Sequence, residues 1–133
     1  MIKLGVLVCA ILLAPRFGDA AGAQTQLEMN QTAERALKAA ETAMSNELGR
    51  LTKLAARKPS SVAKLQAAQL AWQAFRDAHI KAFWPSEVRG AYGSVHPMCV
   101  AQELTRLTNA RVAELKQMTT SAQGDVCACQ WPD

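Results

Sequence analysis

Apolar residues recur at helical spacing in three long segments of this chain. In the first, from about residue 25 to 57, the apolar positions are Leu27, Ala33, Leu37, Ala40, Met44, Leu48, Leu51 and Ala55. Steps of three and four place these side chains on one face of a helix. Charged residues such as Glu41 and Glu47 fall between them, so we expect a solvated opposite face.

A second segment, from about 62 to 83, follows Pro59, which cannot continue a helix. We expect Ser60 or Ser61 to cap it. Its stripe comprises Leu65, Ala68, Trp72, Phe75, Arg76, His79 and Phe83. Two of the aromatic residues, Trp72 and Phe75, should supply most of its burial.

A third segment, from about 97 to 118, has its stripe at Val100, Leu104, Leu107, Arg111, Leu115 and Met118. The short connection between the first two segments makes them antiparallel neighbours. The fold predicted is all-α: a small antiparallel three-helix bundle with a structured loop between its second and third helices.

The connection from residue 84 to 97 contains two Gly and two Pro, which indicates a structured loop. It is the best candidate contact surface, because glycine permits unusual backbone geometry and the neighbouring side chains offer polar tips and an amphipathic ring. The candidate binding residues here are Arg89, Tyr92, Gly93, Ser94 and His96. The alternative is a tight turn in which Ser94 caps backbone groups.

Arg76 and Arg111 lie on or beside apolar stripes, where a guanidinium is costly unless it is paired. Asp77 follows Arg76, and Thr108 precedes Arg111 by about one turn. We interpret the two arginines as an internal clamp that ties the third helix to the second and to the loop. A ligand site at Arg76, Asp77 and Arg111 is the alternative.

The N-terminus reads as a secretory signal peptide over residues 1–23. Lys3 precedes an apolar run from 4 to 14, and Ala21 and Ala23 are small residues suited to cleavage after Ala23. A membrane anchor and a lipidated Cys9 are the alternatives. We therefore expect a periplasmic or secreted protein, without stable membrane insertion after cleavage. It would comprise a helical domain at 24–118 and a polar tail at 119–133.

Three cysteines remain after cleavage: Cys99, Cys127 and Cys129. In an oxidising compartment an odd count indicates one disulfide and one leftover thiol, or a bridge between molecules. We expect Cys99 to pair with a tail cysteine, and the tail to be ordered only through that bond. A weaker hypothesis joins His96 to the three cysteines as ligands for zinc or copper.

Charge and motifs exclude several classes of function. The whole chain carries a net charge of +4, or +3 once Lys3, Arg16 and Asp19 are removed, and it has no run of basic residues. Nucleic acid is therefore not an expected partner. No catalytic motif or phosphate-binding loop is present, so we expect no enzyme, no catalytic residues and no cofactor.

Several short motifs together resemble the LprI-like lysozyme inhibitors over about residues 24–118. They are Gln69-x-x-Trp72-x-x-Phe75-Arg76-Asp77, Gly93-Ser94, Leu107-Thr108-x-x-Arg111-x-x-x-Leu115 and, near the start, Gln26-x-x-Met29-Asn30-x-x-Ala33. The resemblance implies a helical envelope domain in which Trp72 and Thr108 are structural. Where this family usually has cysteines, the chain has Thr32, His79 and, about one turn beyond Cys99, Glu103.

The leading hypothesis is an exported binding protein that inhibits lysozyme by occlusion. The loop would enter the glycosidase cleft and engage its two carboxylates, with donors from Arg89, Ser94 or His96 and with Tyr92 in a sugar subsite. The alternatives are an envelope structural or adaptor module that binds another envelope protein and, less favoured, a periplasmic metal-binding protein.

Overall fold

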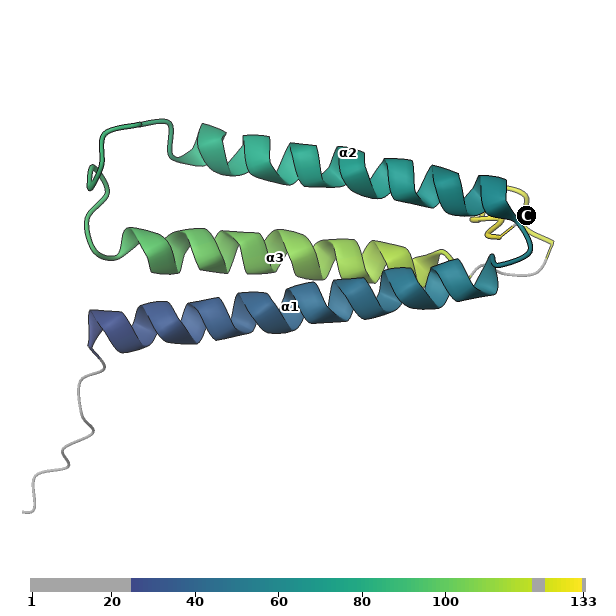
Figure 1. Ribbon diagram of the computed structural model, residues 1–133, viewed down its shortest axis with the longest axis horizontal. Helices are drawn as coiled ribbons and strands as arrows, with labels where there is room; N and C mark the ends of the chain where they lie inside the picture. Colours follow the sequence, from purple (N-terminus) through teal and green to yellow (C-terminus); the bar gives the residue numbers. More distant parts are fainter. Residues whose placement is uncertain (1–24, 121–123, 133) are drawn as a thin grey trace, which may run out of the picture.

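The structure is a computed structural model that describes residues 25–120 and 124–132. Three helices make up its regular structure: α1 (Gln26–Leu54), α2 (Pro59–Phe83) and α3 (His96–Gln117). Consecutive helices run in opposite directions, so α1 and α3 run parallel (Figure 1). The predicted all-α three-helix bundle is confirmed. The predicted signal peptide lies outside the described residues.

The helix starts follow from local chemistry. Thr25 and Glu28 form a capping box at α1, in which the Thr25 Oγ1 accepts from Glu28 N at 3.2 Å and Glu28 Oε2 accepts from Thr25 N at 2.8 Å. Pro59 lies inside the first turn of α2, where its missing N–H costs nothing. The predicted serine cap is wrong, because no side chain caps α2 and Ser61 instead donates to the carbonyl of Pro132.

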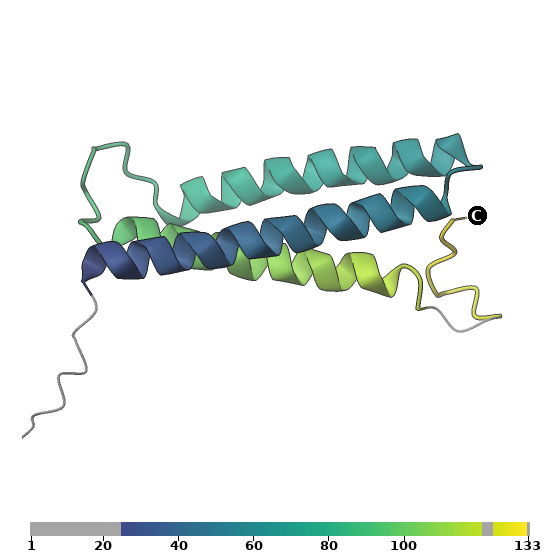
Figure 2. The ribbon, with the colours of Figure 1, turned by 60° about the horizontal axis from the view of Figure 1, so that its bottom comes forward.

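The core lies mainly between α1 and α3, which pack side by side along their length, with α2 further away (Figure 2). Its central cluster consists of Met44, Leu51, Leu65, Val112 and Leu115. Leu51 and Leu115 are fully buried. The short connection between α1 and α2 sets their direction, but the main packing partner of α1 is α3.

The buried face of α2 differs from the predicted stripe. Gln69 is buried, whereas Phe75 and Phe83 are 54% and 55% exposed. Ala68 is also exposed. Hydrophobicity alone favoured the phenylalanines, but hydrogen bonds to both neighbouring helices hold Gln69 inside.

Glu47 is also not solvated as predicted, since only 8% of it is exposed. Arg50 Nε donates to its carboxylate at 3.0 Å, and this hydrogen bond holds the pKa of Glu47 below its usual value. Arg50 Nη2 also donates to Thr119 Oγ1 at 2.9 Å. The pair therefore joins the end of α1 to the residues that follow α3.

The C-terminal segment 124–132 folds back onto the bundle without the expected disulfide. Trp131 packs against the core cluster, and the Ser61 hydroxyl holds the carbonyl of Pro132 at 3.1 Å. No disulfide joins Cys99 to either tail cysteine in the described ranges. Cys99 lies in the first turn of α3, and the tail begins beyond its other end, after about 27 Å of helix. A disulfide needs Cα atoms within about 7 Å, so the predicted pairing is wrong.

The core predicts unequal effects of two leucine substitutions one turn apart on α1. Leu51 is fully buried and Leu54 is 54% exposed. Leu51→Ala should lower the free energy of unfolding by about 3 kcal/mol, because it leaves a cavity, and Leu54→Ala by less than about 1 kcal/mol. Urea unfolding followed by circular dichroism measures both. Equal losses would contradict the described core.

Candidate functional site

The loop between α2 and α3 is built from successive tight turns. Ala91 N donates to Val88 O at 3.1 Å, Gly93 N to Gly90 O at 3.0 Å, and His96 N to Gly93 O at 3.3 Å. Gly90 and Gly93 have φ angles of +80° and +70°, a region that other residues rarely occupy. The structured loop and the special geometry expected of Gly93 are both present. The backbone path of the loop is therefore defined by its own hydrogen bonds.

Three rings pack inside the loop and anchor it to the bundle. The His96 ring lies 4.8 Å from the Tyr92 ring and 5.3 Å from the Trp84 ring, measured between centroids. The Tyr92 hydroxyl accepts from Ser86 N at 2.7 Å. Tyr92 is thus engaged within the loop at both its ring and its hydroxyl, and it is only half-buried.

Asn30, in the first turns of α1, also holds the loop. Its Nδ2 donates to the carbonyl of Ser94 at 3.2 Å across 64 residues of sequence. Asn30 belongs to one of the quoted motifs, but no local pattern could assign it to the loop, since the contact exists only once the helices pack. Ser94 itself is exposed.

The loop presents a mixed surface at one end of the bundle. Arg89, Gly93 and Ser94 are exposed. Val88 and Val95 add apolar surface, at 71% and 40% exposed. Short polar groups, one cation, the carboxylate of the exposed Glu87 and two apolar side chains therefore stand on a backbone whose shape is held from within.

Aromatic rings extend this surface along α2. Centroids are 5.6 Å apart for Phe75 and His79, 4.5 Å for His79 and Phe83, and 5.5 Å for Phe83 and Trp84. The rings then continue through Trp84 to His96 and Tyr92. We call this set the aromatic strip: Phe75, His79, Phe83, Trp84, Tyr92 and His96. Its two phenylalanines are more than half exposed.

Arg76 lies in the middle of the bundle, away from the loop turns, with 20% of its side chain exposed. Its guanidinium carbon is 5.6 Å from the centroid of Trp72. Its Nη1 lies 3.5 Å from Glu41 Oε1 on α1, and its Nη2 lies 3.2 Å from Asp77 Oδ1. The ion pair with Glu41 therefore ties α2 to α1, and the cation–π contact with Trp72 holds the guanidinium against α2 itself.

Arg111 ties α2 to α3, as the clamp hypothesis expects. Its Nε donates to Gln69 Oε1 at 3.2 Å and its Nη1 lies 3.0 Å from Glu114 Oε2. Gln69 Nε2 in turn donates to the sulfur of Met44 on α1 at 3.4 Å. The predicted tie to the loop is wrong, because Arg111 lies in the C-terminal half of α3 and the loop precedes its N-terminus.

A third tie joins α2 to α3 nearer the loop. His79 Nε2 lies 2.8 Å from Glu103 Oε1, and Arg106 Nε donates to Glu103 Oε2 at 2.9 Å. The hydrogen bond from Arg106, followed by that from His79, lowers the pKa of Glu103 to about 2. His79 and Glu103 stand where the resemblance implies cysteines, and here the two side chains make a non-covalent link.

The hypothesised four-ligand metal set does not come together. His96 and Cys99 lie at the start of α3, whereas Cys127 and Cys129 lie in the tail beyond its end. Within residues 25–120 and 124–132, no group of three or more His, Cys, Asp or Glu side chains is placed to hold a metal ion. Thr108, expected to be structural, is fully buried in α3.

Comparison with known proteins adds one finding. A family model described as "Lysozyme inhibitor LprI" matches residues 18–115, which include α1, α2, the loop and nearly all of α3. No curated protein and no solved structure gives a significant match. None of the helices in the described ranges is both long enough and apolar enough to cross a membrane.

The Glu103 carboxylate predicts a pH effect on stability. Its pKa is depressed in the folded chain, so its contribution is present above about pH 4.5 and is lost as the pH falls toward 2. Glu103→Gln should therefore lower Tm at pH 6 and reduce the fall in Tm between pH 6 and pH 2.

Thermal unfolding followed by circular dichroism measures both effects. Glu34→Gln, on the exposed face of α1, is the matched control and should leave the profile nearly unchanged. A Glu103→Gln profile parallel to that of the unmodified protein would contradict the assignment.

Proposed function

This chain belongs to the lysozyme inhibitor LprI family, and from that premise we propose that it is an exported inhibitor that occludes the cleft of a lysozyme. The contact surface is the loop of residues 84–95 together with the aromatic strip. Inhibition is the function at the level of the family, and it is a binding function rather than a catalytic one. The periplasm or the extracellular space is the location we propose, because lysozyme acts there on the cell envelope.

The observation that carries this proposal is the exposed aromatic strip that leads into a fixed loop. Phe75 and Phe83 keep more than half of their surface open to solvent, although each is large and apolar. Aromatic side chains are enriched at the energetic centres of protein interfaces. Phe75 and Phe83 lie beside the loop, so an apolar area adjoins the polar groups of the loop. Protein interfaces have this arrangement of an apolar core and a polar rim.

Arg89 is the group that we propose to engage the catalytic carboxylates. Glycosidases of this kind use a pair of carboxyl groups that flank the scissile bond. A guanidinium can bind carboxylates through two parallel hydrogen bonds, and Arg89 is exposed on the loop. Ser94 supplies a second donor from the same exposed end.

In this proposal Tyr92 and His96 hold the loop in shape rather than enter the lysozyme cleft. The Tyr92 hydroxyl already accepts a backbone hydrogen bond, and the His96 ring is packed against both Tyr92 and Trp84. Fixing the loop before binding lowers the conformational entropy lost on association. The pre-formed turns and packed rings therefore favour affinity without direct contact.

Charge sets the expected kinetics. Without residues 1–23 the chain has a net charge of +3 and offers no long-range attraction toward a basic lysozyme. Short-range contacts must then supply the affinity, and salt should raise the association rate rather than lower it, because salt screens the repulsion between two positively charged proteins. The geometry does not support the metal-binding alternative, since its hypothesised ligands lie at opposite ends of α3.

Turbidity clearing of peptidoglycan by lysozyme, with and without the purified protein, tests the proposal. The protein should slow clearing in a concentration-dependent way. Arg89→Glu should raise the concentration for half-inhibition by at least about tenfold, because it places an anion beside the catalytic carboxylates. Phe83→Ala should also weaken inhibition, through loss of apolar contact area.

Arg57→Glu is the matched control, because Arg57 is equally exposed but lies after α1 at the other end of the bundle. It should stay within about twofold of the unmodified protein. No protection at a large molar excess would refute inhibition and favour the adaptor alternative. Protection that is unaffected by Arg89→Glu and Phe83→Ala would keep inhibition but refute this surface.

A further inference from the structure

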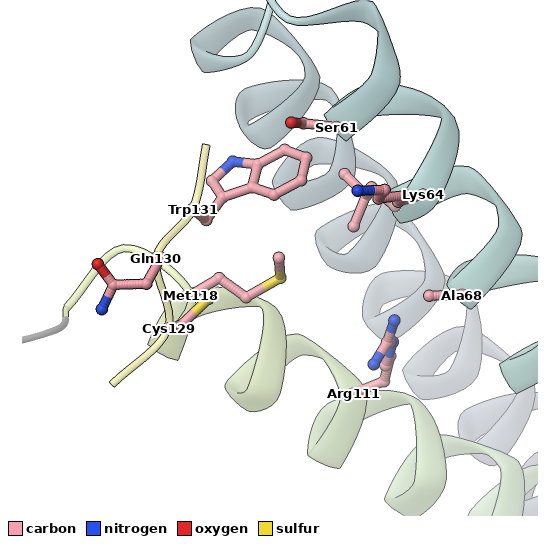
Figure 3. Close-up of a pocket in the computed structure, with 9 residues that line it drawn as sticks. Ser61, Lys64, Ala68, Arg111, Met118, Cys129, Gln130 and Trp131 are labelled. Atoms are coloured by element: carbon pink, nitrogen blue, oxygen red, sulfur yellow. The ribbon is translucent and has the colours of Figure 1, made fainter. Parts of the chain in front are cut away.

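A concave site, separate from the loop surface, lies at the end of the bundle opposite the loop. Its walls come from the first half of α2, the last turns of α3 and the tail (Figure 3). The apolar part of the lining consists of Leu65, Ala68, Met118 and Trp131. The cavity has a volume of about 380 Å³, within the range typical of small-molecule pockets.

We propose that this pocket binds a small amphipathic carboxylate, such as a medium-chain fatty acid. At roughly 30 Å³ for each water-sized group, the volume holds about a dozen non-hydrogen atoms. The apolar chain of the ligand would lie against Met118 and Trp131. Its carboxylate would face the two cations of the lining, Lys64 and Arg111.

Charge complementarity supports an anionic head group. Lys64 and Arg111 are the charged residues among those that line the pocket, and no acidic side chain of the described residues joins them. Both point toward the space between α2 and α3 (Figure 3). Arg111 is mostly buried beside these apolar walls, where a cation favours an anionic partner, whereas Lys64 is exposed.

Arg111 is held in place but retains donor capacity. Its Nε is used by Gln69 and its Nη1 by Glu114, whereas a guanidinium carries five N–H donors. Only 15% of its side chain is exposed, so the guanidinium lies mostly against the protein. The ion pair with Glu114 offsets part of its charge, and Lys64 supplies the second positive charge.

The tail completes the site. Trp131 packs against the core cluster, and Gln130 Nε2 donates to the carbonyls of Asp125 and Ala128 at 2.9 and 3.0 Å. These bonds fold the segment on itself, and the contact between Ser61 and Pro132 holds it against the bundle without a disulfide. The indole Nε1 of Trp131 is buried and has no hydrogen-bond partner among the described residues. The tail thus forms a wall that the helices alone do not provide.

Titration of the purified protein with sodium decanoate, followed by ¹H–¹⁵N NMR and calorimetry, tests the proposal. Amide shifts should concentrate on residues 61–68 and 128–131, and not on the loop of residues 84–95. Lys64→Glu should weaken binding by about tenfold, as loss of one charge-assisted contact predicts. Trp131→Ala should weaken it as well.

Lys81→Glu is the matched control, since Lys81 is an exposed lysine on the same helix but does not line the pocket. It should leave the affinity within about twofold. Decanol, which has the same chain without the charge, should bind at least about tenfold more weakly than decanoate. Equal affinity for decanol, shifts confined to the loop, or an unchanged affinity in Lys64→Glu would each overturn the proposal, whatever the outcome for lysozyme.

Discussion

The packing of α1 against α3 around Leu51 and Leu115 is the constraint on which the rest of this structure depends. These two side chains are fully buried, and the helices that carry them run parallel. After the first of two adjacent parallel helices ends, the chain must run back to the starting end of the bundle before the second can begin. Here α2 is the segment that runs back. As a result, the loop and the tail lie at opposite ends of the bundle, where they form separate surfaces.

Polar side chains join α2 to the other helices, because few apolar side chains are buried there. α2 buries few apolar residues, and it is joined to its neighbours through Gln69, Arg76 and His79. Hydrogen-bonded groups of this kind have directional requirements, so they fix the rotation of a helix more narrowly than a smooth apolar stripe does. With Gln69 turned inward, Phe75 and Phe83 are turned outward. The exposed aromatic strip is therefore a consequence of how α2 is attached.

The two ends of the bundle suit different ligands. At the loop end, internal turns and packed rings hold exposed polar and aromatic groups in place, which suits a large protein surface. At the tail end, a cavity of about 380 Å³ with two cations suits a small molecule. Arg76 and Arg111 lie between these ends and serve first to hold the helices together. Arg111 also lines the cavity at the tail end.

Sequence periodicity by itself determined the three helices, their approximate limits, the structured loop and the need for Gly93, because these depend on contacts within a few residues. It also indicated that Arg111 must be paired. It could not decide which face of α2 is buried, that Asn30 reaches Ser94, or that Glu103 meets His79, since those contacts join residues far apart in the chain. The separation of Cys99 from the tail cysteines has the same origin. The rigid length of α3 keeps them apart, a fact that only the assembled helices could establish.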